Sequence, residues 1–209
     1  MINTLIGLFN RERIGLTLVG LALIVLVLAL AAPRDVTLRD ASPVVYLHGA
    51  LVWTAILALT AAGVVGLAGL VLGRDLLHAW SGALARTGTL FWVIYLPFSM
   101  WASKVTWNGI PLGDPRFRTA FQVLVLAGGF QIAATLWGGR NRLVSGLNAA
   151  VAVILWVLTL TTQDVMHPQN PMRSSASTIQ FFFALLVGGC GLAALQVARW
   201  MRPSKDKTT

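Results

Sequence analysis

Residues 104–118 read KVTWNGIPLGDPRFR and form the longest polar interruption in the hydrophobic middle of the chain. The stretch contains two prolines, two glycines and several basic residues. A segment with so many turn-forming residues leaves backbone N–H and C=O groups unpaired. Unpaired backbone groups are not tolerated in the interior of a bilayer. We therefore expect a loop at a membrane surface, packed over the mouth of a helix bundle and joining two segments that cross the bilayer.

The sequence on both sides of this loop is strongly apolar. The 209 residues are 56% hydrophobic and 11% charged, whereas soluble domains carry about 25% charged residues. Apolar runs of roughly eighteen residues or more are typical of transmembrane helices. The sequence therefore predicts an all-α membrane protein, a six-helix transmembrane bundle with short loops. The predicted spans are 14–32, 49–73, 88–103, 119–138, 143–162 and 179–198.

The formal net charge of +9 does not indicate a nucleic-acid-binding protein. The basic residues are spread over the loops and are not interleaved with aromatic residues on one face. Ten of the sixteen Lys and Arg residues lie in segments on the N-terminal side of the predicted membrane, and six lie in the opposite loops. The positive-inside rule then predicts that both termini are cytoplasmic and that the protein is a multi-pass protein of the inner (plasma) membrane.

This orientation defines the predicted organisation of the chain. Residues 1–13 are a cytoplasmic lead-in, 14–198 are the transmembrane domain, and 199–209 are a basic cytoplasmic tail. The outer, periplasmic loops are 33–48, 104–118 and 163–178.

The first span ends in a sequence, Ala29-Leu30-Ala31, that resembles a signal-peptide cleavage site. Its apolar run is longer than the roughly 7–15 residues of a signal-peptide core, which favours a retained membrane anchor. Cleavage would leave five spans and the same outer loops.

Several residues are interpreted as structural. The single cysteine, Cys190, falls in the last span and is expected to be a small packing residue. His78, in the predicted inner segment 74–86, is interpreted as an ordinary interfacial residue. Glycines three and four residues apart in the second span predict close helix packing: Gly63, Gly66, Gly69 and Gly73. Four tryptophans are assigned to the interfacial aromatic belts: Trp92, Trp137, Trp156 and Trp200.

Two histidines, His48 and His167, are predicted at the outer ends of the second and fifth spans, on the same side as the loop 104–118. Neutral imidazole is a good ligand for haem iron, so this pair predicts a haem site. The alternative is that each histidine bridges headgroups and water at the interface. Four cationic residues are candidate partners for haem propionates: Lys104, Arg116, Arg39 and Arg173. Two methionines are candidate substitute ligands: Met166 and Met172.

The sequence does not predict an enzyme. It has no Cys/His cluster with zinc spacing and no second carboxylate close to Asp114 for paired acid–base catalysis. It also lacks a Gly-rich phosphate loop and a nucleophile elbow. Neither a hydrolase nor a nucleotide-driven pump is indicated.

The loop and the histidines together resemble the CcmC branch of the cytochrome c assembly family, whose members hold haem at the outer membrane face. The family's tryptophan-rich loop follows roughly KPTWGxWWxWDPR, and KVTWNGIPLGDPR matches it in register without a gap. The segments VVYLHGALVW and DVMHPQ resemble the regions around its haem-associated histidines, which places that role on His48 and His167. The matching loop residues are Lys104, Thr106, Trp107, Asp114, Pro115 and Arg116.

This resemblance implies binding of haem b and a role in haem delivery or export for c-type cytochrome biogenesis. It further implies membrane-protein partners, either a haem transporter or cytochrome complex subunits. Three tryptophans of the family loop are replaced here by Ile110, Pro111 and Gly113. That departure favours an alternative, a b-haem-binding subunit of an electron-transfer or photosynthetic complex. A permanently bound haem needs iron ligands, but it does not need a tryptophan surface from which haem is handed over. A structural membrane subunit without haem is the third interpretation.

Overall fold

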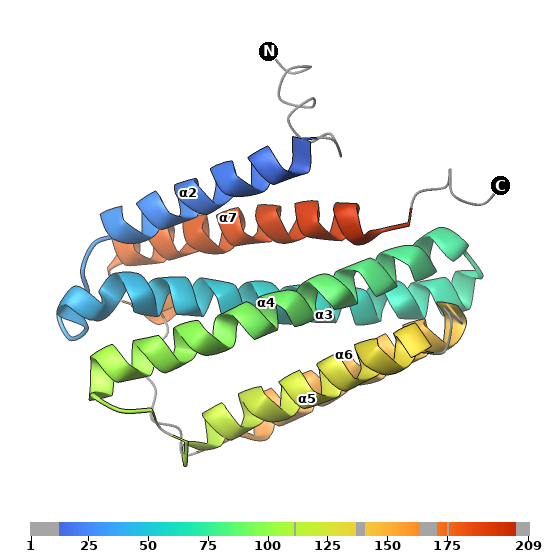
Figure 1. Ribbon diagram of the computed structural model, residues 1–209. Helices are drawn as coiled ribbons and strands as arrows, with labels where there is room; N and C mark the ends of the chain where they lie inside the picture. The colour runs from blue at the N-terminus through green and yellow to red at the C-terminus, as the bar shows by residue number, and fades with distance from the viewer. Residues whose placement is uncertain (1–12, 111, 137–140, 164–170, 175, 204–209) are drawn as a thin grey trace.

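The computed structural model describes residues 13–110, 112–136, 141–163, 171–174 and 176–203. The regular structure in this part of the chain is helical (Figure 1). The long helices are α2 (Ile14–Ala31), α3 (Ser42–Leu72), α4 (Asp75–Trp107), α5 (Pro115–Leu136), α6 (Asn141–Thr161) and α7 (Ser177–Met201). Two short 3-10 helices are η2 (Arg39–Ala41) and η3 (Pro171–Arg173).

Five of these helical segments are long and apolar enough to cross a membrane: α2, η2 with α3, α5, α6 and α7. The all-α class is confirmed, and the apolar helices are typical of an integral membrane protein. The remaining long helix, α4, has 33 residues and carries Asp75, Arg86 and Lys104. It is not among the helices that are apolar enough to cross a membrane by length and composition alone.

Consecutive long helices run in opposite directions, so their ends gather at two ends of the bundle (Figure 1). We call the end where α2 begins and α7 ends the terminal end. It also contains the two-residue turn between α3 and α4. The opposite end, called the loop end, contains the α2–α3 connection, the α4–α5 loop and the start of α7. The topology thus brings the three segments with candidate site residues to one end.

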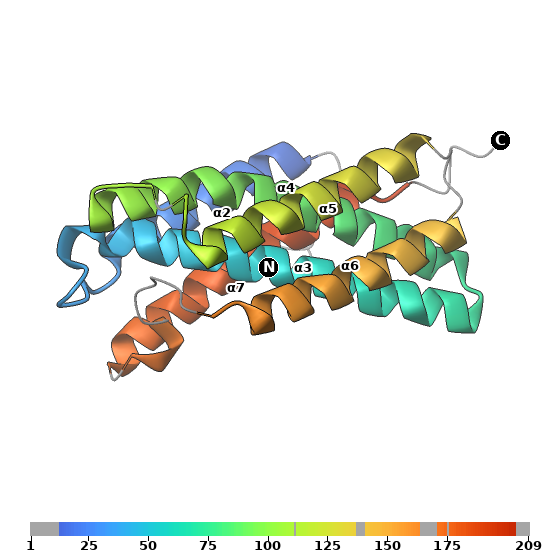
Figure 2. The same ribbon diagram turned by 90° about the horizontal axis from the view of Figure 1, so that it is seen from below.

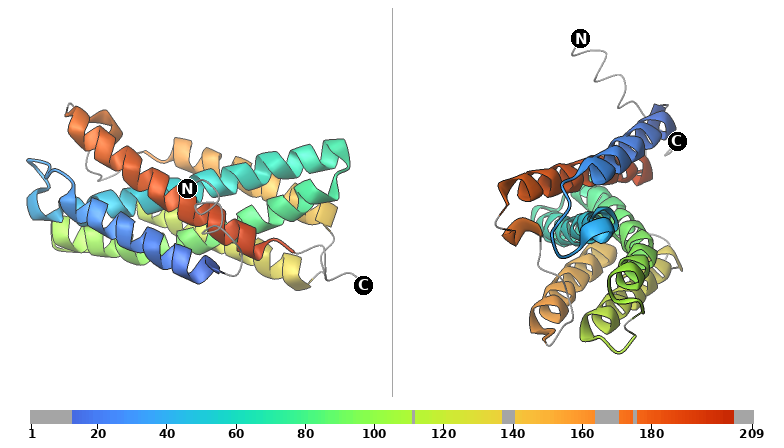
Figure 3. Two further views of the ribbon diagram at one scale, coloured as in Figure 1. Left: turned by 90° about the horizontal axis from the view of Figure 1, so that it is seen from above. Right: turned by 90° about the vertical axis from the view of Figure 1, so that its left-hand side faces the viewer.

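Helices α3 and α4 form the centre of the bundle and share its most extensive helix–helix contact. Helices α2 and α7 pack together on one side, and α5 and α6 pack together on the other side (Figures 2 and 3). Helix α3 also packs against both α6 and α7. Its small residues allow this central position because they leave room for three neighbours.

The predicted tight packing at the α3 glycines is confirmed where α3 meets α4 and α6. A methyl group added at Gly66 would lie 2.7 Å from the backbone oxygen of Ser145 and 2.8 Å from the Ser81 hydroxyl oxygen. Gly73 has a different role. Its backbone is left-handed, with φ of 63°, and its N–H donates to the Gly69 carbonyl, which ends α3.

The segment 74–86, predicted as an inner loop or an interfacial helix, is helical from its second residue onward and forms the beginning of α4. The connection from α3 is only Gly73 and Arg74. A hydropathy pattern suggests a surface segment here because it contains polar residues, but His78 and Ser81 are buried against other helices. Similarly, α3 begins at Ser42, so the predicted outer loop 33–48 is helical over its last seven residues.

The assignment of Cys190 to the helix core is confirmed. The thiol is free and buried within α7, in the main hydrophobic core.

Candidate functional site

His48 lies in the second turn of α3, near the loop end, and only 8% of its surface is exposed. Its imidazole ring packs against the ring of Tyr95 in α4, with centroids 5.1 Å apart and planes inclined by 30°. Such burial does not fit a histidine that only bridges headgroups and water. The position at the end of a central helix was predicted, but the packing against α4 was not.

Tyr95 connects His48 to a further aromatic residue, Trp92. The rings of Tyr95 and Trp92 meet edge to face, with centroids 5.4 Å apart. The Trp92 indole donates a 2.8 Å hydrogen bond to the Ala120 carbonyl of α5. The assignment of Trp92 to an interfacial belt is therefore wrong, because its buried N–H has a partner inside the bundle. Ring contacts thus join His48 of α3 to Tyr95 and Trp92 of α4, and the Trp92 hydrogen bond joins α4 to α5.

The first part of the predicted loop forms the end of α4. Lys104 is exposed in the last helical turn, where its charge complements the negative end of the helix dipole. Trp107 is the last helical residue and is 38% exposed. Asn108 follows in the left-handed conformation, with φ of 54°, and ends the helix. Lys104 and Trp107, which match the family motif, therefore both lie in the last turn of α4.

The second part of the loop begins α5. One carboxylate oxygen of Asp114 accepts hydrogen bonds from the backbone N–H groups of Arg116, at 2.8 Å, and Phe117, at 3.3 Å. Pro115 is the first helical residue, where its missing N–H costs nothing. Asp114 is therefore an N-cap, and the Asp-Pro-Arg match has a structural role independent of any cofactor.

Replacing Asp114 with alanine is expected to lower the free energy of unfolding by about 1 kcal/mol, because α5 loses its cap. Asp114→Asn should retain nearly the full stability, since asparagine caps comparably. Reversible unfolding in mixed micelles, followed by circular dichroism, would measure both variants. Equal losses in the two variants would show that the charge, and not the cap, is what matters.

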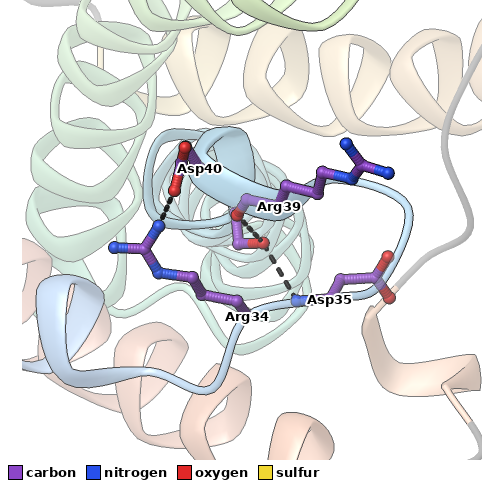
Figure 4. Close-up of polar contacts among 5 residues, drawn as sticks. Arg34, Asp35, Arg39 and Asp40 are labelled. Atoms are coloured by element: carbon purple, nitrogen blue, oxygen red, sulfur yellow. Dashed lines mark hydrogen bonds and ion pairs between the residues drawn. The ribbon is translucent and has the colours of Figure 1, made fainter.

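The α2–α3 connection presents another cation at the loop end. Arg34 forms an ion pair with Asp40, and the Ser42 hydroxyl accepts from the Asp35 N–H at 3.0 Å and donates to the Arg39 carbonyl at 2.8 Å (Figure 4). The Arg39 guanidinium extends away from these contacts in Figure 4. Arg39 and Arg116 are both exposed and available to an anionic ligand.

The hydrogen bond from the Thr37 hydroxyl lowers the pKa of Asp35 below its ordinary value of 3.8. Burial acts in the opposite direction, and backbone N–H groups of Thr37 and Leu38 add to the lowering. Because the folded pKa is depressed, the carboxylate stabilises this connection above pH 3.8. That contribution is lost as the pH falls through the folded pKa.

His167 and Met166 lie outside the described residues, as does Pro111. The pairing of His48 with His167 on one iron therefore stays a prediction. Met172 lies in η3 at the loop end with an exposed side chain. Arg173 belongs to the same short helix. Within the described residues, no group of three or more His, Cys, Asp or Glu side chains is arranged to hold a metal ion.

Side chains of the types that a haem site uses lie toward the loop end among the described residues. They include the imidazole of His48, which packs against Tyr95, and Trp107 at the end of α4. Lys104, Arg39 and Arg116 are exposed cations suited to propionates. Because His48 is buried, a porphyrin could reach its ring only if the covering side chains moved.

A buried polar cluster at the terminal half of the bundle was missed. His78 is 3% exposed, so its assignment as an interfacial residue is wrong. Its Nδ1 lies 2.7 Å from the Ser145 hydroxyl of α6, and the Asn148 amide donates to Ser81 at 2.9 Å. Ser81 in turn donates to the Ala62 carbonyl of α3. Within this cluster, each helix contributes two polar residues that are three positions apart: His78 and Ser81 in α4, and Ser145 and Asn148 in α6. This spacing places each pair on one helix face. It is the sequence signal that could have revealed the cluster.

No family model matches this sequence, and no curated protein matches it. The likeness to the cytochrome c assembly family therefore rests on the quoted motifs, and the function drawn from it is a proposal.

Proposed function

We propose that this chain is an integral membrane protein that binds haem b at the loop end and delivers or exports it for c-type cytochrome biogenesis. The observation that carries the proposal is that the helical topology brings His48 and the 104–116 motif to the same end of the bundle. Three different helices, α3, α4 and α5, contribute these residues. A haem-handling site requires this combination of an imidazole, aromatic surface and cations.

In this proposal His48 ligates the haem iron, and His167 is the second candidate ligand. The iron–porphyrin supplies ligand-binding and redox chemistry when it is bound. Tyr95 holds the His48 ring against α4, which limits the orientations the imidazole can take. Trp107 offers an apolar contact for the porphyrin, and Lys104 and Arg116 pair with its propionates. No catalytic step is assigned to the protein.

The proposed membrane arrangement has six crossings, with α4 as the crossing between α3 and α5. The support is that α4 runs antiparallel to both neighbours and spans 33 residues, or about 50 Å. The terminal end is proposed to be cytoplasmic and the loop end periplasmic. Among the described helices and the residues that adjoin them, the terminal end has several Arg side chains and one acidic residue, Asp75. The positive-inside rule associates such an excess of positive charge with the cytoplasmic side.

A second candidate is a b-haem-binding or purely structural subunit of a membrane complex. The altered loop favours it, because Ile110 exposes an aliphatic side chain and Gly113 has no side chain where the family has indoles. The cap role of Asp114 also favours it, because the start of α5 alone accounts for the matched Asp114 and Pro115. A permanently held cofactor would need His48 but no indole platform.

The absorbance spectrum of protein purified in detergent tests the proposal. We expect a Soret band, and transfer of that haem to an apo-cytochrome or apo-myoglobin acceptor within minutes to hours. A stable, reversibly reducible haem that does not transfer would favour the fixed-cofactor subunit. The absence of a Soret band, after expression with added haem precursor, would refute haem binding and leave the structural subunit.

A further inference from the structure

An unusual arginine lies within α4 at the terminal end of the bundle. Arg86 is the twelfth residue of the helix and is exposed, and its guanidinium donates a 2.9 Å hydrogen bond to the carbonyl of Met201. Met201 is the last residue of α7 and lies beside Arg86 and Thr87 of α4. The arginine thus binds one of the carbonyl groups that the end of a helix leaves without an internal partner.

Two more arginines lie at the same helix end. The Arg202 guanidinium lies over the Trp80 ring of α4, 4.7 Å from its centroid. Arg199 is exposed in the last turn of α7 and contacts the Gln196 side-chain oxygen at 3.5 Å. Arg86 of α4 therefore contacts the end of α7, and Arg199 and Arg202 lie in the last turn of α7 and at its C-cap.

The described long helices offer little acidic charge to oppose Arg86 and Arg199. Within the six described long helices, Asp75 is the only acidic residue. It begins α4, eleven residues before Arg86 and therefore about 16 Å away along the helix axis. The recorded partners of Arg86 and Arg199 are neutral oxygens. The loop end differs, because there Arg34 is paired with Asp40.

The chemistry of this junction suits an oxyanion at a membrane interface. Trp80 and Trp200 flank it, and indoles concentrate at the headgroup level of bilayers. Gln196, which is 2% exposed, has a side-chain nitrogen without a hydrogen-bond partner among the described residues. Basic pockets between transmembrane helices bind the headgroups of anionic lipids.

We propose that Arg86, Arg199 and Arg202, beside Trp80, bind the phosphate of an anionic phospholipid headgroup at the α4–α7 junction. The bound phosphate neutralises charge on these guanidinium groups and joins the end of α7 to α4. This site lies at the opposite end of the bundle from the proposed haem site and does not depend on it.

The double variant Arg199→Gln/Arg202→Gln tests the site while leaving the Arg86 contact with Met201 in place. Native mass spectrometry of the full chain with phosphatidylglycerol should show affinity roughly twentyfold weaker than for the unaltered protein, because each basic residue at an anionic surface contributes about fivefold. Arg199→Lys/Arg202→Lys should retain most of the binding. Arg118→Gln, which removes an exposed cation from the loop end, is the matched control and should bind like the unaltered protein.

Equal binding in the double glutamine variant and in Arg118→Gln would overturn the proposal. Phosphatidylcholine should not substitute for phosphatidylglycerol, and equal binding of the two lipids would exclude recognition of the anionic headgroup. Inorganic phosphate at the same concentration distinguishes a free-anion site. If it displaces the lipid or raises the unfolding temperature as much as phosphatidylglycerol does, the ligand is a soluble oxyanion and the lipid assignment is wrong.

Discussion

The His48→Ala variant is expected to copurify with less than about a tenth of the haem held by the unaltered protein. Loss of a partner that merely supports a metal ligand costs about 10–100-fold in affinity, so loss of a ligand itself should cost at least as much. His48 is the imidazole that the described structure places at the loop end, packed against Tyr95. The ratio of Soret absorbance to protein absorbance measures the effect.

His78→Gln is the matched control, because it alters the other described imidazole. His78 lies in the buried polar cluster near the terminal end, hydrogen-bonded to Ser145. This variant should keep its Soret band per mole of folded protein, even if its stability falls. Full haem content in His48→Ala would refute the ligand assignment. Loss of haem in His78→Gln alone would move the site to the terminal half of the bundle.

The Gly66→Ala variant is expected to lose about 2 kcal/mol or more of unfolding free energy, as overpacking of a tight interior commonly does. The new methyl group would lie 2.7 Å from the Ser145 backbone oxygen and 2.8 Å from the Ser81 hydroxyl. A backbone atom cannot rotate away, so α6 must shift relative to α3. That shift would also disturb the hydrogen bonds that Ser81 makes with Ala62 and Asn148.

The control replaces a glycine with alanine where space is open. At Gly129 in α5, nothing lies within 4 Å of an added methyl group. Gly129→Ala should therefore be neutral or stabilising, by up to about 1 kcal/mol from helix propensity. Tryptophan fluorescence during reversible unfolding in mixed micelles would compare the two variants. Equal stability of Gly66→Ala and Gly129→Ala would contradict the close approach of α3 to α6.

Much of the fold was predictable because it depends on local sequence. The apolar run predicted at 14–32 is helix α2 at 14–31, and the glycine, proline and polar residues after position 107 mark the turn before α5. Asp114 followed by Pro115 is a strong helix-start signal. Apolar runs and turn residues determine where helices form and end through residues that are close together in the chain. Local sequence patterns are therefore enough to predict these features.

The errors share one physical cause. His78 and Trp92 carry polar atoms, and local sequence suggests that such residues face water or headgroups. In the structure their polar atoms contact Ser145 in α6 and the Ala120 carbonyl in α5. Because those partners are 67 and 28 residues away in the chain, no local pattern predicts that the polar groups can be buried.

The sequence alone predicts an all-α chain with several helices long and apolar enough to cross a membrane, and a loop at 104–118. The structure shortens that loop, because α4 continues to Trp107 and α5 begins at Pro115. Alternating helices of similar length also place His48 near the end that holds this segment. Only the tertiary structure decided that His48 packs on Tyr95, that Arg86 binds the end of α7, and that α4 extends through residues taken for a surface segment. These features depend on contacts between helices. There, side chains that are distant in sequence pack together, and their polar groups form hydrogen bonds with groups of other helices.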